Sequence, residues 1–134
     1  MPLDIAPLTN ATNRLREGLA RYNLDISDEQ IRDGLIQRFE FTYELSHKML
    51  KRFMEQTAGT PDEFDQMEFS TLIRTGNERG LLKGEWPDWK EYRGKRARSS
   101  HTYDVKVALE VVAIIPAFLA EAEFLCAEIA RRQG

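Results

Sequence analysis

The fold is decided by the stretch VKVALEVVAIIPAFLAEAEFLCAEI, residues 105–129. Its apolar residues recur at intervals of three and four, the period of an α-helix, and form a broad stripe. The stripe consists of Ala108, Val111, Val112, Ile115, Phe118, Leu119, Ala122, Leu125 and Ile129. Asp104 is a plausible N-cap, and Pro116 is expected to kink the helix. Because the stripe is broad, helices must pack on more than one side of it.

Two earlier segments show the same period. After Pro7, a first helix is predicted with Leu8, Ala11, Leu15, Leu19 and Tyr22 on one face. A second begins after Ser27, which forms a capping-box pattern with Gln30, and continues to about Gln56. Its apolar face contains Ile31, Leu35, Phe39, Thr42, Leu45, Met49 and Phe53. Gly59-Thr60-Pro61 is expected to stop this helix, with Thr60 capping a short turn.

Two shorter helices are expected between these segments and residues 105–129. One is marked by Phe69, Leu72, Ile73 and Gly76, and Gly80 should end it. Pro87 opens the other, in which Trp86, Trp89, Tyr92 and Arg96 share a side. The Ser99-Ser100-His101 segment then weakens helical propensity. No alternating strand pattern, internal repeat or linker is present, so we predict an all-α, four- or five-helix up-and-down bundle in which residues 1–134 form one domain.

Composition narrows the class of protein. The 134 residues carry a net charge of -3, which argues against a wholly basic nucleic-acid binder. The single cysteine, Cys126, cannot form an intramolecular disulfide and is interpreted as a small core residue. No signal-peptide pattern or membrane span is apparent, which predicts a cytoplasmic protein without membrane contact.

Basic residues are concentrated between Lys90 and Arg98. Arg93, Lys95 and Arg98 are candidates to hold the phosphates of RNA or a nucleotide, although such a cluster can equally be a solvated helix face. The short junction next to it contains a fixed cation, an imidazole and a phenol, which are the side chains of Arg96, His101 and Tyr103. A histidine can exchange protons with a ribose 2'-hydroxyl or a leaving oxygen while an arginine stabilises phosphoryl charge. Phosphodiester chemistry without a metal or cofactor is therefore one hypothesis.

No other strong motif appears. With two histidines and one cysteine, the sequence has no metal-ligand spacing, and it has no glycine-rich phosphate loop. The polar residues of the second helix, such as Glu44 and Lys48, are interpreted mainly as surface ion pairs at helical spacing. His47 is interpreted as a packed or solvated imidazole.

Two blocks carry a family resemblance. The first is residues 32–48, RDGLIQRFEFTYELSHK, and the second comprises Gly80-Leu81-Leu82, Trp89 and the segment from Arg96 to Tyr103. Together they resemble the nucleotidyltransferase substrate-binding protein family of the HEPN superfamily, over about residues 8–130. The resemblance implies a small helical bundle that dimerises and pairs with a separately encoded minimal nucleotidyltransferase.

The resemblance also implies roles for individual residues. Arg96 and His101 would be the ribonuclease-type pair, and Tyr103 the tyrosine that the partner adenylylates. Asp33, Arg38 and Glu44 would be candidates to orient that pair. Ala97 stands where the family usually has asparagine, and His47 where it usually has tryptophan.

Two functions follow and stay open at this point. One is a metal-independent RNase toxin silenced by adenylylation, and the other is a non-catalytic subunit that presents substrate to the nucleotidyltransferase. Retention of the arginine, histidine and tyrosine favours the first, and Ala97 favours the second. The chain lacks the Gly-Ser turn and paired aspartates of nucleotidyltransferases, so it is not expected to be one. The apolar breadth of the second and last helices predicts a homodimer.

Overall fold

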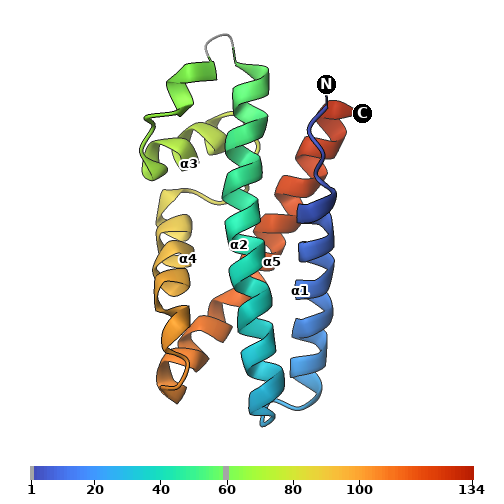
Figure 1. Ribbon diagram of the computed structural model, residues 1–134, viewed down its shortest axis with the longest axis vertical. Coiled ribbons are helices and arrows are strands. Elements are labelled where there is room, and N and C mark those ends of the chain that lie inside the picture. The colour runs from blue at the N-terminus through green and yellow to red at the C-terminus, as the bar shows by residue number, and fades with distance from the viewer. Residues whose placement is uncertain (1, 59–60) are drawn as a thin grey trace.

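The computed structural model describes residues 2–58 and 61–134, and this part of the chain is helical without a strand. Its α-helices are α1 (Ala6–Leu24), α2 (Glu29–Thr57), α3 (Phe69–Glu78), α4 (Trp86–Arg98) and α5 (Val105–Gln133). Two short 3-10 helices are η1 (Pro61–Phe64) and η2 (Ser99–His101). In Figure 1, α2 lies between α1 and α4, with α5 behind it.

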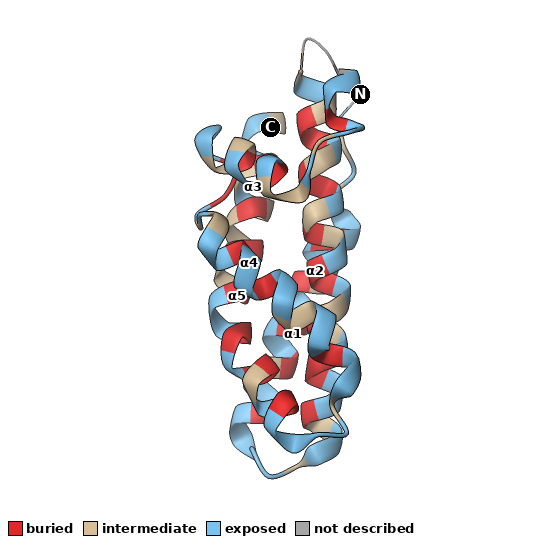
Figure 2. Cartoon of the chain, turned by 90° about the vertical axis from the view of Figure 1, so that its left-hand side faces the viewer, coloured by how far each residue is buried: buried red, intermediate tan, exposed pale blue. Residues whose placement is uncertain are grey.

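The core follows the predicted periodicity, except that Ala11, Leu19, Ile31 and Leu45, predicted on the apolar faces of the first two helices, are only half-buried. Every residue of the predicted stripe on α5 is buried, and the buried residues of the helices face the interior of the bundle (Figure 2). An aromatic cluster fills the centre, where the Phe118 ring packs edge-on against Phe39 at 5.1 Å and Trp89 at 6.0 Å. These contacts join α2, α4 and α5 around one apolar interior.

The helix starts confirm one predicted cap, correct another, and place one predicted helix start a residue earlier. Asp104 caps α5 as predicted, because its carboxylate accepts hydrogen bonds from two backbone amides of the first turn. The N-cap of α2 is Asp28, not Ser27, which hydrogen-bonds Asp25 instead. Helix α4 begins one residue before Pro87, after Glu85. Proline is tolerated there because first-turn amides have no partner within the helix.

The remaining predictions concern turns and breaks. Helix α3 ends at Glu78, two residues before Gly80, which has a φ of +76°, a conformation that glycine adopts without strain. Pro116 lies inside α5 without ending it. Gly59 and Thr60, predicted to end α2 and to cap the next turn, lie outside the described residues. Within the described ranges, no helix is both long and apolar enough to cross a bilayer.

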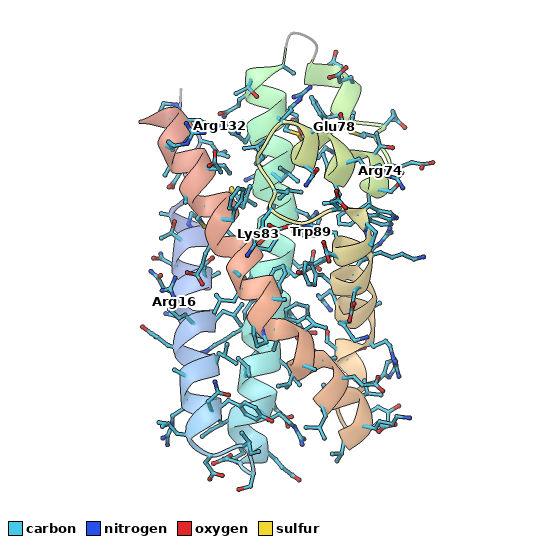
Figure 3. The ribbon with its side chains drawn as sticks, turned by 180° about the vertical axis from the view of Figure 1, so that it is seen from behind. Arg16, Arg74, Glu78, Lys83, Trp89 and Arg132 are labelled. Carbon is cyan, nitrogen blue, oxygen red and sulfur yellow. The ribbon has the colours of Figure 1, made fainter. Side chains whose placement is uncertain are left out.

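One buried carboxylate fixes the start of α4. Glu121 on α5 is 2 % exposed and accepts hydrogen bonds from the backbone amides of Lys83 and Gly84, both at 2.8 Å. It also accepts one from the indole Nε1 of Trp89 at 2.6 Å. Figure 3 labels Lys83 and Trp89, on the face where the link between α3 and α4 passes α5. Glu121 therefore anchors the helix that carries Arg96.

Candidate functional site

The candidate site lies where α4 ends and α5 begins. Arg96 is in the last turn of α4, and Ser99–His101 continue as the short helix η2. Asp104 then starts α5, so the backbone reverses within a few residues. This reversal places Arg96, His101 and Tyr103 on one junction, as predicted from the sequence.

Arg96 is held by two carboxylates of α2 and one serine. Its Nε donates to Glu44 at 3.1 Å, and its Nη1 donates to Glu40 at 3.1 Å and to the Ser99 hydroxyl at 3.3 Å. The buried Ser99 hydroxyl in turn donates to Glu40 at 2.6 Å. These bonds fix the plane of the guanidinium, while its Nη2 makes no hydrogen bond to any residue that the structure describes.

His101 and Tyr103 are exposed beside this network. The Tyr103 side chain is 84 % exposed, and its hydroxyl lies 3.4 Å from His101 Nδ1. The two rings pack edge to face with centroids 5.9 Å apart. No hydrogen bond joins Arg96 to His101 within residues 2–58 and 61–134. The chain therefore presents the imidazole and phenol to solvent and holds the arginine separately, one turn away.

The three residues expected to orient the pair have different positions. Glu44 contacts Arg96 directly and also lies 3.3 Å from His47. Asp33 instead pairs with Arg32 at 3.3 Å, about two helical turns before Glu40. Arg38 is a clearer departure from the expectation: its guanidinium donates to the Arg14 carbonyl of α1 at 2.7 Å.

The physical reason for these departures is helical geometry. Two residues along an α-helix rotate the side chain by about 200°, so Arg38 and Glu40 point to nearly opposite sides of α2. Glu40 and Glu44 are four residues apart and share the side that faces α4. Glu40 and Ser99 are therefore site residues that sequence reasoning missed. The available signal was the i, i+4 spacing of two glutamates within the residue 32–48 block.

Two of the three candidate phosphate-binding residues, Arg93 and Arg98, already contact other side chains of this chain. Arg98 pairs with Glu110 at 3.1 Å, and the Arg93 guanidinium lies over the Phe69 ring at 5.0 Å. Lys95 is half-buried and forms no ion pair with a described residue. Of the three cations, Lys95 is the one without a charged or aromatic partner in this part of the chain.

Two further observations concern the residues around the site, the pKa of Tyr43 and the grouping of possible metal ligands. Burial raises the pKa of Tyr43, which packs between His47 and the core, to about 12. Among the described residues, no three His, Cys, Asp or Glu side chains lie together as a metal site would require.

Comparison with known proteins gives the family. A model of the family described as "nucleotidyltransferase substrate binding protein like" matches residues 3–131. A Haemophilus influenzae protein named probable ribonuclease HepT is 41 % identical over 99 residues, covering 74 % of this chain and 67 % of the relative.

Solved structures agree with this assignment. One Haemophilus influenzae structure, described as revealing the fold of a substrate-binding domain of a nucleotidyltransferase, has a TM-score of 0.87 and 33 % identity. The match covers 95 % of this chain and 99 % of that one. A Thermus thermophilus structure, at TM-score 0.70 and 23 % identity, covers 91 % of this chain and 98 % of its own, and shows the shared fold. The expected HEPN-like helical bundle is confirmed, and the chain belongs to the nucleotidyltransferase substrate-binding protein family.

Proposed function

We propose that this chain is the HEPN subunit of a two-component, toxin-antitoxin type module, that it binds a separately encoded minimal nucleotidyltransferase, and that it cleaves RNA without a metal. The family match supports the proposed binding to a nucleotidyltransferase, and the relative named as a probable ribonuclease supports the proposed RNA cleavage. The observation that carries the catalytic half is the fixed Arg96, held by Glu40, Glu44 and Ser99 one turn before an exposed His101.

The reaction that fits these groups is transesterification at a ribose. His101 takes the proton of the 2'-hydroxyl, O2' forms a bond to phosphorus, and the bond from phosphorus to O5' breaks. The products are a 2',3'-cyclic phosphate and a 5'-hydroxyl, which receives the proton. Arg96 uses its free Nη2 to stabilise charge on the phosphoryl oxygens.

The site works in a homodimer in this proposal. Val105 and Leu109 are about half exposed beside the junction, although both are large apolar residues on the helix that begins there. A second copy covers them and brings the histidines of two chains to one groove, where one acts as base and the other as acid. Residues 1–134 act as one cytoplasmic domain.

In this proposal, adenylylation of Tyr103 regulates RNA cleavage. Its hydroxyl attacks the α-phosphorus of ATP held by the partner and releases pyrophosphate, which leaves AMP on the phenol oxygen. Because the hydroxyl lies 3.4 Å from His101, the added phosphate and adenosine occupy the space that RNA needs. The high exposure of Tyr103 supports its access to a partner enzyme.

A specific observation favours a second function, a non-catalytic subunit that presents substrate to the nucleotidyltransferase. The single positive charge of Arg96 faces two carboxylates, Glu40 and Glu44, which disfavours an approaching phosphate. Ala97 adds no polar group to the site.

RNA cleavage by the purified chain separates the two functions. His101→Ala should slow cleavage about 10²- to 10⁴-fold, the usual effect of losing a general acid or base, and Arg96→Ala should have a similar effect. A chelator should leave the wild-type rate unchanged. Intact RNA in every reaction, with tight binding to the nucleotidyltransferase, would establish the presenting subunit instead.

A further inference from the structure

Among the residues that the structure describes, no other helix covers the outward side of α2. In Figure 1, α2 lies in front of α5, and its neighbours α1 and α4 flank it without crossing it. Phe41 projects from this side and is 59 % exposed, and Leu45 next to it is half-buried. The two side chains line the same hollows and are flanked by polar residues, which is the arrangement typical of an interaction site.

Two hollows meet at this pair of residues. One, of about 680 Å³, extends along α2 past Lys48, Lys51 and Arg52. The other, of about 540 Å³, lies between α1 and α2 and includes Arg14 in its lining. Phe41 and Leu45 line both hollows, so they form one continuous surface. We call the surface formed by Arg14, Phe41, Leu45, Lys48, Lys51 and Arg52 the Phe41 face.

The Phe41 face is positively charged in a chain whose net charge is -3. None of its four cations lies within ion-pair distance of a carboxylate in the described part of the chain, whereas Arg16, Arg96 and Arg98 are all ion-paired. Glu44 and Glu55 also line the larger hollow. Glu44 already accepts a hydrogen bond from Arg96, so the four cations are opposed mainly by Glu55. The charge of the Phe41 face is therefore available to an external anion.

We infer that the Phe41 face binds single-stranded RNA, with a base stacked on Phe41 and backbone phosphates on Lys48, Arg52 and Arg14. Exposed aromatic rings interspersed with unpaired cations suit unstacked bases joined by phosphates. Glu44 lines the larger hollow and contacts Arg96, so RNA bound here continues into the candidate site. A second copy fits less well, because a two-fold contact would bring two copies of this positively charged surface against each other. The inference rests on the proposed ribonuclease function.

Binding of a short fluorescein-labelled oligouridine, measured by anisotropy in the His101→Ala background, tests this surface. Phe41→Ala should weaken binding about 5- to 100-fold, and Phe41→Trp should restore it. Lys48→Ala with Arg52→Ala should lower the magnitude of the salt slope by about 1.4, as expected for two lost phosphate contacts. Arg74→Ala with Lys83→Ala removes the same charge from exposed positions on α3 and on the link between α3 and α4, and should change little.

Several results would overturn the inference. RNA affinity unchanged in both Phe41→Ala and the Lys48 and Arg52 double variant would do so. A switch from dimer to monomer in Phe41→Ala with unchanged RNA affinity would assign the surface to a second copy. Loss of nucleotidyltransferase binding in Phe41→Ala, with unchanged RNA affinity, would show that the Phe41 face binds the partner nucleotidyltransferase instead. Failure of the ribonuclease proposal is distinguishable, because it abolishes cleavage while leaving this binding pattern intact.

Discussion

Replacing Glu121 by glutamine tests how the start of α4 is held. The carboxylate uses Oε1 for Gly84 N and Trp89 Nε1, and Oε2 for Lys83 N. A glutamine amide keeps one acceptor oxygen and turns its NH₂ group toward a backbone N–H. The variant therefore leaves one buried donor opposite another donor, which costs about 1–3 kcal/mol of unfolding free energy.

Urea denaturation gives that free energy directly. Glu121→Gln should lower the midpoint without changing the slope, because the surface exposed on unfolding stays the same. Glu123→Gln is the matched control: Glu123 makes an ion pair with Arg16 at 3.2 Å but is 43 % exposed, so its loss should cost no more than about 1 kcal/mol. Equal stability of the two variants would refute the anchoring role of Glu121.

Three further predictions concern modification, assembly and pH. Incubation with the cognate nucleotidyltransferase, magnesium and ATP should add AMP to Tyr103, detected by mass spectrometry and absent in Tyr103→Phe; an unmodified tyrosine beside an active partner contradicts the regulatory proposal. Light scattering at micromolar concentration should give the mass of a dimer, and a strictly monomeric mass contradicts the shared groove. The free energy of unfolding should fall as pH rises from 10 to 12, because unfolding lets Tyr43 and Tyr92 release protons near pH 10 that burial retains to about 12. At pH 12 the loss should reach about 2 kcal/mol per tyrosine and shrink in Tyr43→Phe, whereas a flat profile in this range would show that neither phenol is buried on folding.

The helices and their buried faces were predictable from the sequence because periodicity is a local property. The stripe from Ala108 to Ile129 is buried at every predicted position, since the 3.6-residue turn alone decides which side chains share a face. The cap of α2 was assigned one residue too early. Ser27 and Asp28 are both good N-cap residues, and the turn in which Ser27 bonds Asp25 leaves Asp28 as the cap.

The site was only partly predictable because it joins distant segments. Arg96, His101 and Tyr103 fall on one junction because they are close in sequence. Glu40 is 56 residues from Arg96, and only the packing of α2 beside α4 brings them together. The role of Glu121 was not predictable either, since a glutamate within an apolar stripe does not indicate which hydrogen-bond donors it will contact.

Ribose transesterification by His101 and Arg96 leaves characteristic ends on the RNA fragments. The most direct measurement is mass spectrometry of the fragment ends after purified chain cleaves a defined RNA in the presence of a chelator. We expect 2',3'-cyclic phosphate and 5'-hydroxyl ends from the wild type and almost no fragments from His101→Ala. Intact RNA, or the same fragments at the same rate from His101→Ala, would contradict it.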